Sequence, residues 1–175
     1  MSQQFLELRR RCESVMTGLD IPHPFSIDAL CGRVAEQRGR PLHRHPLPRE
    51  AGESGVCGLW LATSSDDYVF YEAQTSLLHQ EHIVLHEIGH ILFGHNTLDP
   101  EDINRAQPLL PDLEPAHVQQ LLGRTNYSTR QEQEAEMLAS LIRMNADTPH
   151  SEQPQPRGVL AKLESALGVR ESDVH

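Results

Sequence analysis

Two histidines and a glutamate near the middle of the chain have the types and the spacing of a metal-dependent hydrolytic site. His86 and His90 are four residues apart, so a helix places both imidazoles on one face, close enough to bind one ion. Glu87 projects about 100° further around that helix, where its carboxylate can reach a water on the metal without becoming a ligand. Zinc lowers the pKa of such a water toward ~7, and Glu87 can then accept its proton as the water attacks a peptide carbonyl. The segment HEIGH therefore predicts Zn²⁺ as cofactor and Glu87 as the catalytic residue.

The helix that carries this motif is expected over about residues 76–93, with Gly94 ending it. Its two arcs differ in character: histidines at 79, 82, 86 and 90 share one arc, and the apolar residues Val84, Leu85, Ile88, Ile91 and Leu92 share the other. One face is thus expected to pack and the other to present imidazoles. His79 and His82 are interpreted as residues that line the cleft or support the ligands. His95, beyond Gly94, is interpreted as a capping or exposed residue.

Two histidines and a water leave a tetrahedral zinc one protein ligand short. A helix expected over about residues 129–145 can supply it. Glu132 and Glu136 lie on the same side of this helix as small alanines that permit close approach to the motif helix, so either acid can reach the metal. Glu134 lies about 200° from Glu132 and is expected to face away from the site.

The remaining pattern predicts an α+β fold with two helices first, over about residues 4–19 and 26–39. Two runs rich in β-branched and aromatic residues, at 56–63 and 67–72, then predict a β-hairpin that leads into the motif helix. The second run, DYVFYE, is a candidate for the rim of the cleft, where it would hold an extended substrate by strand addition.

The segments between these elements contain many turn-forming residues. Residues 41–55 are expected to be a mobile excursion, begun at most by a short strand, with His43 and His45 exposed to solvent. Residues 96–128 are acidic and punctuated by prolines, which indicates a surface insertion holding one short helix at about 114–122.

The expected organisation is one domain with a tail. The domain covers residues 1–147, of which 1–39 are the N-terminal helices and 56–147 the catalytic core, with the hairpin packed on the motif helix. A polar, proline-rich linker is expected over 148–158 and a short C-terminal helical tail over 159–175.

Composition narrows the functional classes. The formal charge is −10, and residues 51–175 hold 19 of the 25 acidic side chains, so direct binding of nucleic acid is not expected. The cysteines Cys12, Cys31 and Cys57 are widely spaced, which argues against a disulfide framework and against a thiolate metal site. The start of the chain lacks the pattern of a secretory signal, and no apolar run approaches the ~20 residues of a membrane span. A cytoplasmic location without membrane association is expected.

The segment HEIGHILFGH, followed later by EQEAEMLASLIRM, resembles the ImmA/IrrE family of metallopeptidases. The resemblance implies His86, His90 and Glu132 as zinc ligands, Glu87 as the catalytic acid and base, and Glu136 as a group that hydrogen-bonds to a ligating histidine. It also implies a small zincin-like domain and, as partner and substrate, a helix-turn-helix transcriptional repressor.

The leading hypothesis is therefore a zinc-dependent regulatory endopeptidase that cleaves a partner protein inside the cell. The alternative is a non-catalytic, metal-dependent regulator that binds its partner in the same groove. A weaker third reading is a metal-dependent hydrolase of a small molecule. Glu87 favours catalysis, because a purely structural zinc site gains nothing from an acid at that position. Tyr127 and His117 are both chemically able to stabilise an oxyanion, although each is interpreted as a structural or surface residue.

Overall fold

The computed structural model describes residues 1–55, 57–96 and 98–148. Most of the expected linker, and the whole of the expected C-terminal helix, lie outside the described residues. Within the described part, no helix is long and apolar enough to cross a membrane.

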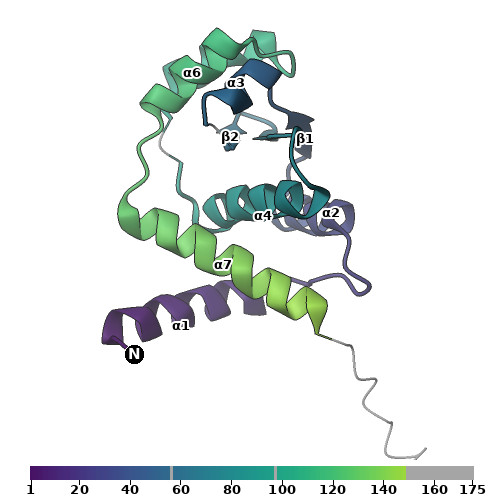
Figure 1. Cartoon of the computed structure of the whole chain (residues 1–175), viewed down its shortest axis with the longest axis vertical. Coiled ribbons are helices and arrows are strands. Elements are labelled where there is room, and N and C mark those ends of the chain that lie inside the picture. The colour runs from purple at the N-terminus through teal and green to yellow at the C-terminus, as the bar shows by residue number, and fades with distance from the viewer. Residues whose placement is uncertain (56, 97, 149–175) are drawn as a thin grey trace, which may run out of the picture.

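The fold is mixed α+β, as expected (Figure 1). The helices are α1 (Gln3–Thr17), α2 (Ile27–Arg38), α3 (Arg49–Glu53), α4 (Leu77–Phe93), α5 (Pro100–Ala106), α6 (Pro115–Arg124) and α7 (Thr129–Asp147), with a 3₁₀ turn η1 at Gln107–Leu109. The boundaries follow local chemistry, since the side chain of Ser26 caps α2 and that of Ser76 caps α4. Gly39 and Gly94 end these two helices with positive φ angles of 67° and 69°, which glycine adopts without strain.

Three short strands form the sheet in the order β1-β3-β2. The expected hairpin is confirmed: β2 (Gly58–Ala62) pairs antiparallel with β3 (Asp67–Tyr71). On its other side, β3 pairs in parallel with β1 (Leu42–Pro46). The segment 41–55 thus holds a strand and the helix α3. The expectation that His43 and His45 belong to an exposed loop is wrong, because both lie on β1 and are partly buried.

The sheet separates two apolar cores, because neighbouring residues of a strand point to opposite faces. Trp60 and Val69 join the core formed with α1, α2, α4 and α7. Leu59, Leu61 and Phe70 join the other core, which also contains Val118 and Leu121 of α6. Figure 1 shows α3 and α6 beyond one side of the sheet and α4 beyond the other. Side chains between Leu98 and Leu121 thus contribute to the second core, and the expectation that residues 96–128 form a surface insertion is wrong.

The two helices that carry the expected ligands pack with their backbones in close approach. A Cβ atom on Gly89 of α4 would lie 2.8 Å from the Cα atom of Ala135 of α7. Only glycine permits this contact. The close approach of the two helices brings Glu132, one turn earlier on α7, beside the histidines of α4. Helix α7 also packs on α1 (Figure 1).

Candidate metal centre

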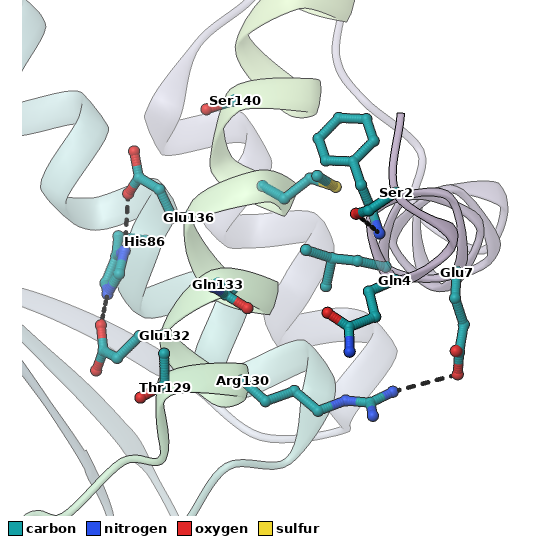
Figure 2. A pocket seen from close by; sticks show the side chains of 13 residues that line it. Ser2, Gln4, Glu7, His86, Thr129, Arg130, Glu132, Gln133, Glu136 and Ser140 are labelled. Atoms are coloured by element: carbon teal, nitrogen blue, oxygen red, sulfur yellow. Dashed lines mark hydrogen bonds and ion pairs between the residues drawn. The ribbon is translucent and has the colours of Figure 1, made fainter.

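The structure brings together His86, His90 and Glu132. The Nε2 atoms of the two histidines are 3.1 Å apart. One carboxylate oxygen of Glu132 lies 3.2 Å from Nε2 of His86, and the other lies 3.6 Å from Nε2 of His90. Figure 2 shows the His86 ring between the carboxylates of Glu132 and Glu136.

These separations match the edges of a zinc coordination tetrahedron. Ligand atoms about 2.0–2.1 Å from a tetrahedral zinc are about 3.3 Å from one another. The three observed distances lie within a few tenths of an ångström of that value. The donor set of two imidazoles and one carboxylate also leaves a fourth position for water or substrate, as catalytic zinc sites require.

Hydrogen bonds determine which nitrogen of His86 faces the cluster. The Glu136 carboxylate lies 3.1 Å from Nδ1 of His86 and 3.0 Å from Nε2 of His82. Partial burial opposes ionisation of Glu136, but the hydrogen bonds from His86 and His82 lower its pKa overall, so it accepts both protons. With its proton on Nδ1, His86 presents the lone pair of Nε2 to the cluster. Glu136 thus occupies the supporting position implied by the family resemblance.

A second hydrogen-bond chain orients His90. Nδ1 of His90 lies 3.0 Å from Nδ1 of His95, and Nε2 of His95 lies 2.9 Å from the Glu134 carboxylate. A carboxylate can only accept here, so His95 donates from Nε2 and accepts at Nδ1 from His90. Nε2 of His90 then carries a lone pair. Burial, with contributions from the neighbouring His86 and His95, lowers the pKa of His90 to about 3, which keeps the ring neutral.

One expectation about this region is wrong. His95 is buried, with 6% of its surface exposed, and is not an exposed or merely capping residue. Glu134 is buried as well, at 2%, and supports His95. Helical periodicity correctly separates Glu134 from Glu132, but that other side of α7 is covered by α1 and by the chain that returns after Gly94. Arg11 of α1 lies 2.8 Å from the Glu134 carboxylate and balances its charge.

The cluster has the character of a cation site. Both Nε2 atoms carry lone pairs, so their 3.1 Å separation is not a hydrogen bond between donor and acceptor. Together with the Glu132 carboxylate they place three electron-rich atoms around one point. The residues present therefore fit a divalent metal, and zinc best by donor type and spacing.

Glu87 lies beside this cluster, where the motif predicts it. Its carboxylate contacts the start of β2 so closely that a Cβ atom on Gly58 would be 2.6 Å from Oε1 of Glu87. Burial raises the pKa of Glu87 to about 8, and the Glu132 carboxylate adds to the rise. A carboxylate destabilised in this way is a strong proton acceptor, although a bound cation would oppose part of the effect.

A cleft of about 510 Å³ gives access to the cluster. One wall is β2, with Gly58 and Trp60, and the other is the segment before α7, with Asn126 and Tyr127. The expectation that DYVFYE forms the rim is wrong, because β3 is the central strand and both of its edges are paired. β2 is the edge strand at the cleft.

Tyr127, which the sequence offered as an oxyanion stabiliser but which was interpreted as a structural or surface residue, lines the cleft. Its ring stacks on His90 with 3.8 Å between centroids and an angle of 12° between planes. Burial, then the carboxylates of Glu87 and Glu132, raise its pKa, so the hydroxyl stays protonated and can donate a hydrogen bond. His117, the other candidate, accepts a backbone hydrogen bond at the start of α6 and does not line the cleft.

A wider groove of about 1010 Å³ continues from His86 and Glu132 between α1 and α7 (Figure 2). Phe5 and Leu8 of α1 line one side and Met137 of α7 the other. The cluster therefore stands where a narrow cleft meets an open groove, and long substrates have room on both sides.

Comparisons with protein-family models, curated proteins and solved structures find no match for the chain.

Proposed function

We propose that the chain is a zinc-dependent endopeptidase with a zincin-like active site. The observation that supports this most directly is that the Nε2 atoms of His86 and His90 and the two carboxylate oxygens of Glu132 are separated by distances close to the edge of a zinc tetrahedron. Glu87 stands beside them without being one of the three, which is the arrangement that hydrolysis needs and a structural site does not.

The residues divide the chemistry of peptide hydrolysis between them. His86, His90 and Glu132 would hold zinc, which supplies a Lewis acid that polarises the peptide carbonyl and acidifies water. Glu87 takes the proton of the attacking water and then delivers a proton to the leaving amine as the C–N bond breaks. Tyr127, held against His90, donates its hydroxyl hydrogen to the cleft, where negative charge develops on the carbonyl oxygen.

The substrate class follows from the shape and edges of the cleft. β2 presents an unpaired edge beside the metal centre, to which an extended peptide can add as a further strand. The two adjoining grooves favour cleavage within a chain over removal of a terminal residue. The family resemblance carried by residues 86–95 and 132–144 suggests a helix-turn-helix repressor as the partner protein, and a regulatory role inside the cell.

The test compares the wild type with Glu87→Gln, which removes the proton acceptor and preserves side-chain shape. Zinc-loaded wild type should release discrete fragments from peptide mixtures and from a candidate repressor, as detected by mass spectrometry. Glu87→Gln should keep one equivalent of zinc at this centre and lose at least 100-fold in cleavage rate. Full cleavage by the variant would exclude this mechanism.

The non-catalytic alternative makes a different prediction in the same experiment. A metal-dependent binding protein would retain an intact partner, and chelation would release that partner without any fragment having formed. Binding that depends on zinc, together with an absence of cleavage of every peptide and protein tested, would favour this alternative.

A further inference from the structure

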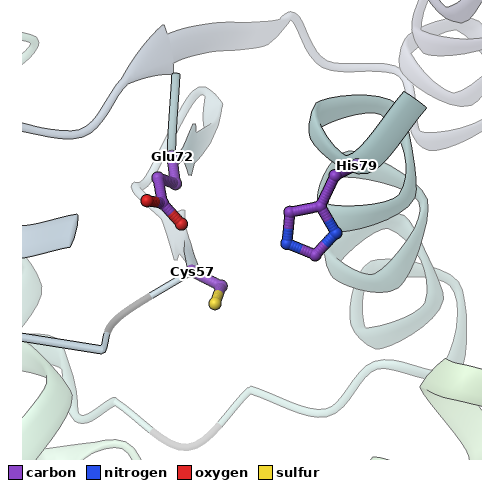
Figure 3. Close-up of side chains that lie close together, drawn as sticks. All are labelled: Cys57, Glu72 and His79. Carbon is purple, nitrogen blue, oxygen red and sulfur yellow. The ribbon is translucent and has the colours of Figure 1, made fainter. Parts of the chain in front are cut away.

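A second group of metal-ligating side chains lies away from the three ligands already described, and two of its three members line the cleft. Cys57, Glu72 and His79 offer a thiol, a carboxylate and an imidazole whose ligand atoms all lie within 4.8 Å of one another. Figure 3 shows the three side chains converging from the start of β2, the end of β3 and the first turn of α4.

The backbone places these residues opposite one another. The amide of Glu72 donates a hydrogen bond of 2.8 Å to the carbonyl of Cys57, which extends the hairpin by one pair. The amide of His79 donates to the Ser76 side chain at the start of α4, so the third residue sits on a capped helix end. Three ordered elements therefore present the donors, and only the side chains need to adjust.

This group is distinct from the first metal centre. His79 precedes His86 by two turns of α4, which is about 10 Å along the helix axis. One ion cannot bridge that separation, and the paired metals of two-metal enzymes are only about 3.5–4 Å apart. His82, which lies between them, is engaged with Glu136.

Among the three cysteines, Cys57 is the one suited to ligation. Cys12 and Cys31 are buried, and burial raises their thiol pKa values to about 11 and about 12. Cys57 is exposed. The wide spacing of the cysteines argued against a thiolate metal site, but a ligand set that mixes residue types across three elements leaves no such signature in sequence.

We propose that Cys57, Glu72 and His79 form a second zinc site. A thiolate, an imidazole and a carboxylate are all zinc ligands, and the thiolate favours zinc over magnesium or calcium. Ligand atoms on one zinc ion would be about 3.6 Å apart for sulfur and nitrogen, so the donors need to close by at most about 1 Å. Cys57 and His79 are exposed, which permits this movement and makes the site weaker than the first centre, where His90 is buried.

Occupancy of this site has a consequence for the cleft, which rests on the proposed function. Cys57 and His79 both line the cleft, one just before β2 and the other on α4. An ion held between them ties the start of β2 to α4 and stands where a peptide would approach the β2 edge. Excess zinc should therefore slow peptide hydrolysis, and Cys57→Ser should remove that inhibition.

Cobalt substitution of the full chain separates the two sites, because only the second contains sulfur. Metal-free protein titrated with Co²⁺ should bind two equivalents and develop the near-ultraviolet charge-transfer band of a cobalt thiolate. Cys57→Ser should bind one equivalent and lack the band. His79→Ala should need at least a tenfold higher cobalt concentration to develop the band. Glu132→Ala, the matched control at the first centre, should lose the other equivalent and retain the band. Zn²⁺ should also protect Cys57 from alkylation.

The outcomes distinguish failure of this proposal from failure of the proposed function. One equivalent of cobalt without a thiolate band, lost in Glu132→Ala, would overturn the second site and leave the first intact. If the wild type instead binds a single equivalent of cobalt that gives the thiolate band and is retained in Glu132→Ala, that result would support the second site and contradict the proposed function. Alkylation of Cys57 at the same rate with and without zinc would count against the second site.

Discussion

At the residue scale, three acids of α7 meet three different partners within five positions. Glu132 approaches the Nε2 atoms of both ligand histidines, and Glu136 receives the Nδ1 proton of His86. Glu134 accepts from His95, which in turn accepts from His90. Each proposed ligand histidine therefore has a carboxylate behind it, directly or through one imidazole, that would orient its ring for a metal.

The sequence contained part of this arrangement. Spacing along the helix placed Glu132 and Glu136 beside the motif histidines, because local geometry alone decides which residues share a face. It could not show what covers the opposite face. Arg11 of α1 and His95 meet Glu134 only after α1 and α7 pack, and no local pattern reports that contact.

These contacts predict different effects for alanine at the three acids. Glu132→Ala should lose most zinc affinity, and Glu136→Ala about 10- to 100-fold, as measured by competition with a chelator. Glu134→Ala should lower the free energy of unfolding of the metal-free protein by about 1–3 kcal/mol in urea denaturation, because the buried His95 loses its acceptor. The ion pair with the half-exposed Arg11 should contribute little.

Gln133→Ala is the matched control on the same helix, since this side chain lines the outer groove and is not in the metal cluster. It should change neither zinc affinity nor stability by more than about 0.5 kcal/mol. An unchanged stability of Glu134→Ala would contradict the buried chain from His90 to Glu134. Full metal retention by Glu132→Ala combined with loss in Glu136→Ala would move the third ligand one turn along α7.

At the scale of elements, prediction succeeded where the signals are local. The capped helices α2 and α4, and the hairpin of β2 and β3, occur close to their predicted bounds because serine caps, terminal glycines and strand patterns act within a few residues. The parallel pairing of β1 with β3 joins residues about 25 positions apart, and it was not foreseen. That pairing makes β3 central and assigns the cleft edge to β2.

The crossing of α4 and α7 predicts a large effect for Gly89→Ala. The added Cβ would lie 2.8 Å from the Cα and 2.9 Å from the carbonyl oxygen of Ala135, both backbone atoms that cannot rotate away. The helices must separate, which should cost about 1–3 kcal/mol of unfolding free energy and withdraw Glu132 from the histidines. Urea denaturation of the metal-free protein and zinc affinity should both report the change.

Gly32→Ala is the matched control, because it makes the same substitution inside α2 with no atom within 4 Å of the new Cβ. It should stabilise the protein by about 0.4–1 kcal/mol through helix propensity and chain entropy. If Gly89→Ala behaves like Gly32→Ala, the helices do not meet at Gly89, and the close approach cannot be what positions Glu132.

At the scale of the whole molecule, two apolar cores form on the two faces of one sheet, whereas the proposed ligands His86 and Glu132 are 22% and 47% exposed. Core burial of this kind stabilises a chain without an ion. Metal-free protein should therefore stay folded, unlike small domains whose folding depends on zinc. Circular dichroism after dialysis against a chelator should retain the helical signal.

Zinc should nevertheless raise the melting temperature, because it binds the assembled ligands far better than the unfolded chain. At a free zinc concentration of 100 times the dissociation constant, binding adds about 2.7 kcal/mol to the free energy of unfolding. This corresponds to a rise in melting temperature of roughly 5–10 °C for a chain of this size. Most of the shift should be lost in Glu132→Ala, which keeps only the weaker second site, and its metal-free form should melt near the metal-free wild type because this carboxylate is 47% exposed. In Glu134→Ala the metal-free form itself should melt lower. An equal loss of stability in both metal-free variants would mean that Glu132 contributes to the fold as much as the buried Glu134, and would contradict its assignment as a side chain that serves the metal alone.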